Sequence, residues 1–364
     1  MPFFTILDRY IFKELLGPFI FGIAAFTCIL AGSSVLFYLV GDAIKYGIPL
    51  MQVIQLFIYK LPSVVVFTFP MSMLLATILA FGRLSSDLEI LALRAGGVGF
   101  YRIVVSVFAM GFLVSGLTVL FNEAVVPQAT YSGQLLMHQY TEKKDPTIKQ
   151  HINLTEYDEK GLPRRIVNVR EVMKGKLQGV TLAEYEHGYL IRVMSAASGA
   201  WVPTGGWNFY NGVMHHFSEQ NPFQVTVIQF QKEYIDIPID PQAQTHEKAP
   251  EEMNSQELKQ RIAFQERTGE DPIQNLMKFH MKFSVPFASL IFAILGAAVG
   301  VRPHRSSSAL GLGISLVIIL IYYILLSVGM GLGIGHVIPP LIAAWFPNLI
   351  IGTAGLVLLR RVAF

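Results

Sequence analysis

The chain has 364 residues, of which 52% are hydrophobic and only 15% are charged. Together with a mean hydropathy of +0.48, these values are typical of a membrane protein that also carries a soluble part. The net charge of +3 is too small to indicate a nucleic-acid partner, and the single cysteine, Cys28, excludes an intramolecular disulfide.

Long apolar runs predict six membrane spans, because a helix of roughly 20 apolar residues crosses a bilayer. A segment of mixed aromatic and charged residues, 1–14, precedes them and is expected to lie in the lipid headgroup region. The spans are expected at residues 15–40, 61–82, 103–122 and 283–301, with two more between 306 and 359. We expect the last two to separate at 329–340, where glycines and prolines interrupt the helix.

Residues 41–60 are predicted to form a short connection between the first two spans. In the third span, Gly111 and Gly116 are expected to let a neighbouring helix approach closely, because they carry no side chain.

The stretch 83–97 lies between two spans and is too short to cross a bilayer. Ser86 and Glu89 have the spacing of a capping box, and Gly96 and Gly97 are suited to end a helix. Apolar residues recur inside it at helical spacing: Leu88, Leu91, Ala92 and Ala95. We expect this helix to dock either into its own bundle or into a groove on a cytoplasmic partner. The alternative is a capped connector whose arginines only fix the topology.

Period-two alternation between turn signals predicts a β region after the third span. The stretches concerned are 165–169, 179–183, 189–193, 207–210 and 224–230. Their spacing favours an all-β sandwich or a jelly roll. A polar helix at 251–267, capped by Ser255, is expected to follow.

These elements predict an α-helical membrane protein with six transmembrane helices and an inserted extracytoplasmic all-β, jelly-roll-like domain. The expected domains are an N-terminal membrane half at 1–127, with a short coupling helix at 84–97, and a β domain at 128–253. A linker helix and the C-terminal membrane half occupy 254–364.

The basic residues of the short loops predict the orientation, since cytoplasmic loops collect Lys and Arg. One side of the membrane collects Arg9, Lys13, Arg83, Arg94, Arg102, Arg302, Arg305, Arg360 and Arg361. The other side has only Lys45 and Lys60 in its short loops. Both termini and the short helix are therefore expected in the cytoplasm, with the β domain outside.

The sequence offers little for chemistry of its own. It has no glycine-rich loop ending in Lys-Ser or Lys-Thr for ATP, and no pattern typical of a hydrolase. His215 and His216 are adjacent on a predicted strand, so they point to opposite faces and do not easily share a metal. None of the apolar runs has an acid or base at its centre, which disfavours an ion-coupled transporter.

Five stretches together resemble the LptF/LptG permease family of the lipopolysaccharide export transporter. They are Leu7–Ile11, Glu89–Gly97, Asn122–Gln128, His280–Pro286 and Pro339–Asn348. Each stretch alone is a weak signal, and their order along the whole chain makes the resemblance strong.

The resemblance implies a permease subunit in the bacterial inner membrane that is not itself an enzyme. The implied partners are a cytoplasmic ABC ATPase dimer, a second permease of the same family (a paralogue or a second copy) and periplasmic jelly-roll bridge proteins. Lipopolysaccharide is the implied cargo, taken from the outer leaflet through a cavity built mainly by the first and fifth spans. No cofactor is expected on this chain, with ATP and magnesium on the ATPase.

The candidate site residues follow from this resemblance. Coupling to the ATPase is assigned to the short helix: Asp87, Glu89, Leu93, Arg94 and Gly97. Lys45 is a candidate for the lipid headgroup, with an interfacial lysine reaching for water as the alternative. Phe37, Tyr323 and Trp207 are candidates for the lipid pathway, although an aromatic side chain such as Trp207 usually packs in a β core.

Two other classes of function remain open. One is a membrane scaffold whose outer β domain binds a periplasmic protein without transport, and the other is a membrane-bound enzyme that acts on lipid.

Overall fold

The computed structural model describes residues 5–144, 149–157, 163–173, 176–186, 189–202, 206–217, 225–236, 248–268, 270–301 and 308–363. The chain divides into two compact units. The helical unit comprises Met1–Lys45, Pro49–Gly133 and Ile273–Phe364, and the sheet unit comprises Tyr46–Ile48 and Gln134–Pro272. The predicted basic turn with Arg302 and Arg305 lies outside the described residues.

Six helical stretches are long and apolar enough to cross a membrane, which confirms the predicted number of spans. The helices of these stretches are α1 (Ile6–Leu30), α2 (Phe37–Tyr46), α3 (Leu50–Ser86), α5 (Phe100–Leu120), α6 (Val126–Lys144), α8 (Ile273–Gly300), α9 (Ser308–Ile334) and α10 (Pro340–Ala363). Two π-helical segments, Ala31–Leu36 and Phe121–Val125, make α1–α2 and α5–α6 continuous. The break between the last two spans falls between Ile334 and Pro340, as expected.

The predicted connection at 41–60 is wrong for most of its length. Helix α2 continues to Tyr46, and α3 begins at Leu50, directly after Pro49. Proline is tolerated at a helix start because the first N–H groups have no partner inside the helix. Gly47, with a φ of +68°, makes the sharp turn between the two helices.

Helices α3 and α8 are the most buried spans, with 78% and 72% of their apolar windows inside the protein. Glycine lets them approach: a Cβ at Gly296 on α8 would lie 1.8 Å from the Thr77 hydroxyl oxygen on α3. Gly111 has the predicted role, since a Cβ there would lie 2.8 Å from the Cβ of Ala293. Gly116 does not, because a Cβ there would meet nothing within 4 Å.

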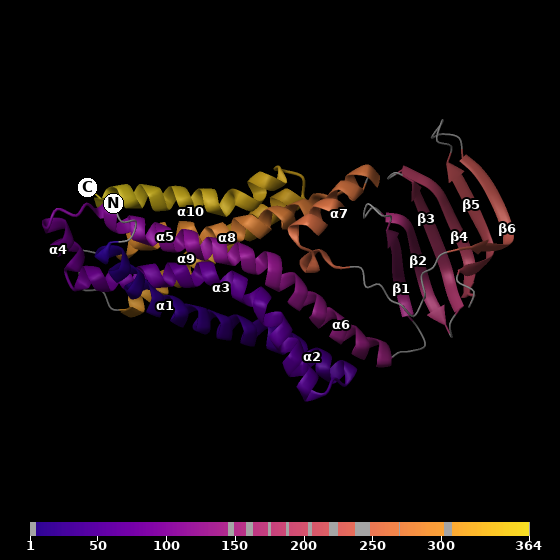
Figure 1. The fold of residues 1–364 in the computed structure, drawn as a ribbon, viewed down its shortest axis with the longest axis horizontal. Coiled ribbons are helices and arrows are strands. Elements are labelled where there is room, and N and C mark those ends of the chain that lie inside the picture. Colours follow the sequence, from indigo (N-terminus) through magenta and orange to yellow (C-terminus); the bar gives the residue numbers. More distant parts are fainter. Residues whose placement is uncertain are drawn as a thin grey trace. The chain divides into compact units, whose positions relative to one another are not determined.

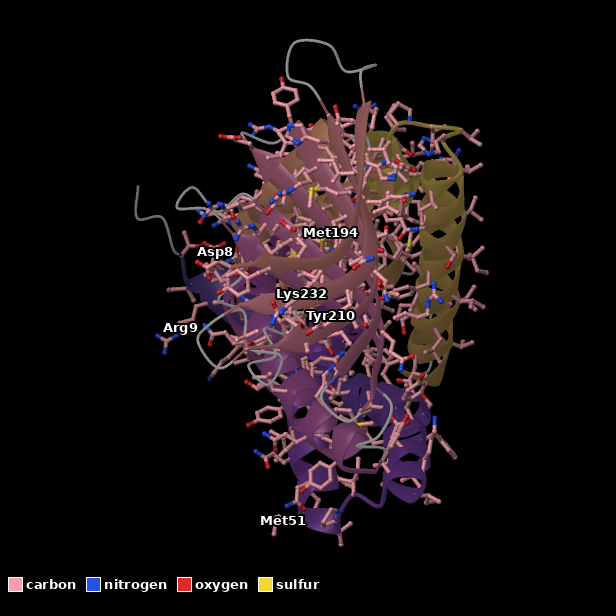
Figure 2. The ribbon with its side chains drawn as sticks, turned by 90° about the vertical axis from the view of Figure 1, so that its right-hand side faces the viewer. Asp8, Arg9, Met51, Met194, Tyr210 and Lys232 are labelled. Carbon is pink, nitrogen blue, oxygen red and sulfur yellow. The ribbon has the colours of Figure 1, made fainter. Side chains whose placement is uncertain are left out.

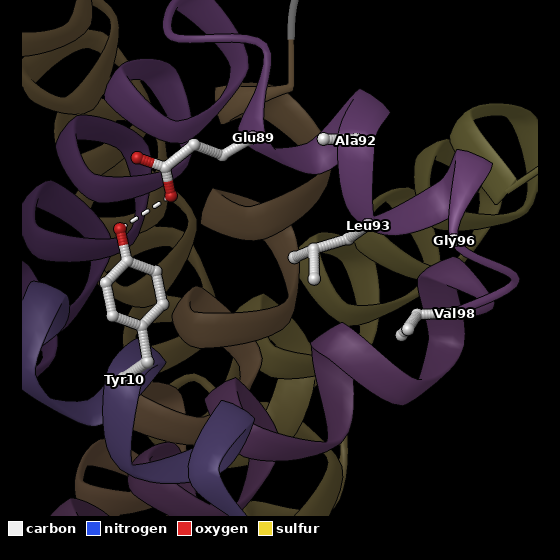
Figure 3. A pocket seen from close by; sticks show the side chains of 6 residues that line it. All are labelled: Tyr10, Glu89, Ala92, Leu93, Gly96 and Val98. Atoms are coloured by element: carbon white, nitrogen blue, oxygen red, sulfur yellow. Dashed lines mark hydrogen bonds between the residues drawn. The ribbon is translucent and has the colours of Figure 1, made fainter.

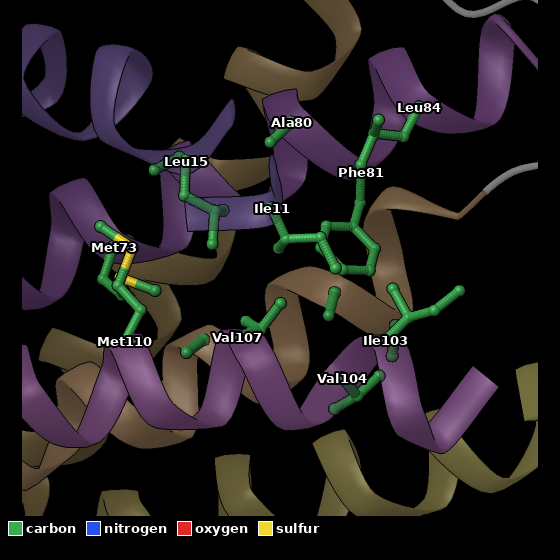
Figure 4. Packing of buried hydrophobic residues seen from close by; sticks show 14 of the residues in the cluster. Ile11, Leu15, Met73, Ala80, Phe81, Leu84, Ile103, Val104, Val107 and Met110 are labelled. Atoms are coloured by element: carbon green, nitrogen blue, oxygen red, sulfur yellow. The ribbon is translucent and has the colours of Figure 1, made fainter. Parts of the chain in front are cut away.

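An apolar core of α1, α3, α5 and α8 side chains lies next to the end of the unit at which α1 begins. Phe81, Ile11 and Ile103 are among its fully buried members, with at most 1% of their surface exposed. Figure 4 shows these side chains interdigitating between the helices. This core anchors the first turns of α1 against α3 and α5.

The sheet unit contains six antiparallel strands that follow one another in sequence order (Figure 1). They are β1 (Lys149–Tyr157), β2 (Pro163–Met173), β3 (Lys176–Glu186), β4 (Tyr189–Trp201), β5 (Trp207–Phe217) and β6 (Val225–Ile235). The prediction of an inserted all-β region is confirmed, and the strands form a single open sheet. Neighbouring strands pair along most of their length, for example Tyr210 with Lys232, which Figure 2 shows side by side. The register shifts between Glu156 and Tyr157 and between Glu184 and Tyr185.

The buried positions of the sheet change parity midway along the strands. They are spaced by three instead of two from Leu177 to Val180, from Ala196 to Gly199 and from Phe209 to Gly212. Gly179 and Asn211 lie within two of these steps and have positive φ values of +63° and +52°, which are typical of an irregularity in a strand. The core continues across the change to Trp207, which is 2% exposed.

A polar helix, α7 (Ser255–Thr268), follows the sheet as expected, after the short 3-10 turn Pro250–Glu252. Its cap is Asn254, one residue before the predicted Ser255. The Asn254 side-chain oxygen accepts hydrogen bonds of 2.9 Å from the N–H groups of Gln256 and Glu257. The ring of Phe264 on α7 packs edge-on against Tyr185 of β3.

Candidate coupling surface

Helix α4 (Glu89–Ala95) lies at one end of the helical unit, next to the start of α1 and the end of α10 (Figure 1). It is separated from α3 by Asp87 and Leu88, and Leu88 has a left-handed φ of 60°. A residue with a left-handed φ cannot continue a right-handed helix, so the chain changes direction at Leu88. It directs a short helix across the end of the bundle.

The predicted capping box of Ser86 and Glu89 is wrong. Ser86 is the last residue of α3, and α4 has no side-chain cap. The Glu89 carboxylate accepts a hydrogen bond of 2.6 Å from the Tyr10 hydroxyl on α1 instead. The predicted end at the glycines is confirmed: Gly97 has a φ of +86°, and the N–H of Val98 donates to the Leu93 carbonyl.

Helix α4 is apolar on two sides, and only one of them is buried. Ile90, 4% exposed, and Leu93 pack into the core of the helical unit. Leu88 and Leu91 are each 62% exposed, and Ala92 and Ala95 are exposed as well. We call Leu88, Leu91, Ala92 and Ala95 the α4 stripe. The stripe is the apolar face that the sequence predicted, and within the described residues of the helical unit it remains open.

A pocket of about 380 Å³ lies beside the stripe (Figure 3). Tyr10, Glu89, Ala92, Leu93, Gly96 and Val98 line it. Its wall is apolar except for the Tyr10 hydroxyl and the Glu89 carboxylate, which Figure 3 shows joined by their hydrogen bond. Such a lining suits an apolar side chain of a partner, together with a basic or hydrogen-bonding side chain next to it that contacts Glu89 or Tyr10.

Two further contacts tie this end of the unit together. Arg83 near the end of α3 lies 3.0 Å from the Glu14 carboxylate on α1 and 3.6 Å from that of Asp87. Arg94 on α4 donates a hydrogen bond of 3.5 Å to the carbonyl of Val362 on α10. Both arginines are exposed, so each contact contributes little to stability by itself.

A buried acid holds the start of α1 to α5. Asp8 is 5% exposed, and its carboxylate accepts two hydrogen bonds of 2.7 Å from the Arg102 guanidinium. The Ser106 hydroxyl donates to the same carboxylate at 2.6 Å, and the N–H and hydroxyl of Thr5 donate at 2.8 Å. The two hydrogen bonds from the Arg102 guanidinium and those from Ser106 and Thr5 offset the cost of burying the Asp8 carboxylate. Together they hold the start of α1 in one position against α5.

The predicted coupling residues are together at this surface. Asp87, Glu89, Leu93, Arg94 and Gly97 all lie on α4 or in the turns that flank it. Sequence reasoning missed Tyr10, Glu14 and Asp8, which reach this end from α1. The available signal was their place in the N-terminal amphipathic segment, with Tyr10 and Glu14 four residues apart on one helix face.

The predicted lipid residues are spread over other elements. Phe37 is 77% exposed at the start of α2, and Lys45 is exposed in the last turn of the same helix. The hydroxyl of Tyr323 on α9 donates to the carbonyl of Phe67 at 3.3 Å. Trp207 is buried in the sheet unit and stacks on Phe209, with ring centroids 6.3 Å apart. The burial of Trp207 agrees with a packing role, and its contact with lipid stays a prediction.

Two of the motif stretches meet in the helical unit. The Asn122 amide donates to the carbonyl of Lys282 at 3.3 Å, and the Lys282 ammonium lies 3.6 Å from the Glu123 carboxylate. These contacts join the π-helical segment after α5 to α8. No group of three or more His, Cys, Asp or Glu side chains is placed to hold a metal in the part of the chain that the structure describes.

Six apolar helices with an inserted antiparallel sheet and a short helix between two spans define a multi-pass membrane protein with a soluble unit. The family model described as lipopolysaccharide export system permease LptF/LptG matches residues 9–361. The chain therefore belongs to the LptF/LptG family and is a transport component of the inner membrane, not a catalytic enzyme. A comparison with individual curated proteins gave no match.

Proposed function

We propose that this chain is the transmembrane subunit of an ATP-driven exporter, with α4 as the surface on which a cytoplasmic ABC ATPase docks. The observation that carries the proposal is the exposed α4 stripe beside the pocket at Glu89. A short helix that exposes leucines at the end of a membrane bundle gains free energy when a partner groove covers them. ATP and Mg²⁺ bind to the ATPase, which supplies the energy.

Charge supports a cytoplasmic position for this end of the unit. Five arginines lie on α4 or on helices that begin or end next to it: Arg9, Arg83, Arg94, Arg102 and Arg360. Cytoplasmic loops carry such an excess of arginine and lysine. Both termini are then cytoplasmic, and the sheet unit, inserted between α6 and α8, is periplasmic.

The least buried spans support a role in moving lipid. The apolar windows of the first and fifth spans are each 22% buried, against 78% for the second span. Their remaining surface is apolar and able to contact acyl chains or a second permease, either a paralogue or a second copy. Phe37 and Tyr323 lie on these two spans, and Lys45 follows at the outer end of the first, where it suits an anionic headgroup.

In this mechanism, lipopolysaccharide enters between the spans from the outer leaflet. Closure of the ATPase dimer pushes on α4 of each permease, narrows the apolar cavity and expels the lipid toward the sheet unit. The sheet unit passes it to periplasmic jelly-roll bridge proteins. Every step by this chain is one of binding and movement, since the proposal assigns no covalent chemistry to it.

Purification from native membranes in a mild detergent tests the proposal. We expect a P-loop ATPase and a glycolipid to co-purify in fixed ratio, together with one like or unlike permease. The absence of any ATPase in two mild detergents would contradict the proposal and favour a scaffold that binds a periplasmic protein.

A further inference from the structure

The first turns of α1 are held by polar contacts on two sides. Tyr10 and Glu14 are four positions apart and share one face of the helix. Tyr10 donates to Glu89 on α4 at 2.6 Å, and Glu14 pairs with Arg83 at the end of α3 at 3.0 Å. The first contact joins α1 to α4, and the second joins α1 to the last turn of α3, which Asp87 and Leu88 separate from α4.

The opposite side of the same turns is joined to α5. Asp8 lies two positions before Tyr10, so the two side chains are about 200° apart around the helix axis and point to opposite sides of α1. It is bound there by Arg102 and Ser106 at 2.7 and 2.6 Å. Helix α1 thus has a fixed support on α5 and a separate link to α4.

Beyond these turns the first span packs on α3 along one face, where Phe19 and Phe26 are buried, and is exposed along the other. Ile20 and Ile29 are 58% and 60% exposed, and Phe37 is 77% exposed. Ile11 and Leu15 are buried in the core that anchors the first turns of α1 against α3 and α5, and their apolar contacts are not directional. A hydrogen bond weakens steeply with distance and angle, so the Tyr10–Glu89 bond sets how this face of α1 lies against α4.

We infer that Tyr10 and Glu14 are positioning residues through which movement of α4 reaches the first span. The inference rests on the proposed function, in which α4 receives the ATPase. When the ATPase displaces α4, the Tyr10–Glu89 contact pulls the start of α1 with it, and the Glu14–Arg83 contact links α1 to the end of α3 from which α4 extends. The Asp8–Arg102 cluster acts as the support about which α1 turns. Movement of α4 thereby moves the first span, which is one of the two least buried spans, although α4 lies between the second and third spans in the sequence.

The test uses the complex purified with its ATPase, reconstituted in liposomes that contain lipopolysaccharide. The variants are Tyr10→Phe, which removes one hydroxyl and keeps the ring, and the double variant Tyr10→Phe with Glu14→Gln. Tyr101→Phe is the matched control, because this tyrosine is 49% exposed at the start of α5, at the same end of the unit. The measured quantities are the amount of ATPase bound, the rate of ATP hydrolysis and the lipid released per ATP.

We expect the double variant, compared with the unchanged protein at equal amounts of bound ATPase, to release about three- to tenfold less lipid per ATP, with Tyr10→Phe alone intermediate. A purely structural role would lower the amount of assembled complex and leave the ratio of lipid to ATP unchanged, which would overturn the inference. The variant Glu89→Lys distinguishes failure of this inference from failure of the proposed function of α4. If it abolishes transport while the double variant keeps the normal ratio, only the inference fails. If Glu89→Lys also transports normally, the proposed function of α4 fails with it.

Discussion

The Tyr10 hydroxyl and the Glu89 carboxylate form a hydrogen bond of 2.6 Å between residues 79 positions apart. It connects the first span to a helix that lies between the second and third spans. Glu89 thereby has a partner inside its own chain at the edge of the pocket that we assign to the ATPase. In the proposed docking, this hydrogen bond would already hold the Glu89 side chain in place and so reduce the conformational entropy lost on binding.

The α4 stripe makes a first prediction about docking. Leu91→Asp replaces a leucine that is 62% exposed with a charge that a partner groove would have to desolvate. We expect the ATPase to bind about 2 kcal/mol more weakly, which is roughly thirtyfold in affinity. Binding of the ATPase to the detergent-solubilised permease measures it.

Ser86→Asp is the control for this variant, since Ser86 is exposed at the end of α3 and is outside the stripe. Equal affinity of Leu91→Asp and the control would exclude the stripe as the docking surface.

The buried acid makes a second prediction, on stability. Asp8→Ala leaves the Arg102 guanidinium and the Ser106 hydroxyl without the acceptor that they share. Because the Arg102 side chain is 39% exposed, we expect a loss of about 2–3 kcal/mol, less than the roughly 3–5 kcal/mol typical of breaking a fully buried pair. Thermal unfolding in detergent measures the loss.

The neighbouring Arg9→Ala variant is the control, because Arg9 is exposed and points away from the chain in Figure 2. We expect it to change stability by no more than about 0.5 kcal/mol. A similar unfolding temperature for both variants would show that the Asp8 cluster contributes no specific stability.

Glycine contacts make a third prediction. Gly296→Ala would bring a Cβ within 1.8 Å of the Thr77 hydroxyl oxygen, so α3 and α8 would have to separate. We expect a loss of about 1–3 kcal/mol or more in unfolding free energy. Gly116→Ala adds the same methyl group where nothing lies within 4 Å, and helix propensity predicts a slight gain. The assignment of close packing at Gly296 would be wrong if both variants unfolded at the same temperature.

The sequence predicted the spans well because insertion of a helix into a membrane depends on the total hydrophobicity of about 20 consecutive residues. Apolar length places the helices, and glycines with two prolines mark the break before α10, without reference to tertiary contacts. The same reasoning failed at 41–60, where polar residues suggested a loop. Those residues are helical because a single tight turn at Gly47 is enough to reverse the chain.

The coupling surface was predicted only in part. The apolar pattern of α4 is local, so it could be found, and the stripe has the exposure that docking needs. The partner of Glu89 could not be found, because the spacing to Ser86 suggested a cap and Tyr10 is distant in sequence. Likewise, the change of parity in the sheet includes the left-handed Gly179 and Asn211 at two of its steps, which period-two alternation does not reveal.

The most direct test of the central claim is lipid-stimulated ATP hydrolysis by the reconstituted complex carrying Glu89→Lys. Ser86→Lys serves as the control, since it introduces the same side chain at the same end of the unit. We predict normal membrane insertion for both variants and at least a roughly tenfold loss of lipid-stimulated hydrolysis for Glu89→Lys alone, equivalent to about 1.4 kcal/mol of coupling. Undiminished lipid-stimulated hydrolysis by Glu89→Lys would contradict the assignment of α4 as the coupling helix.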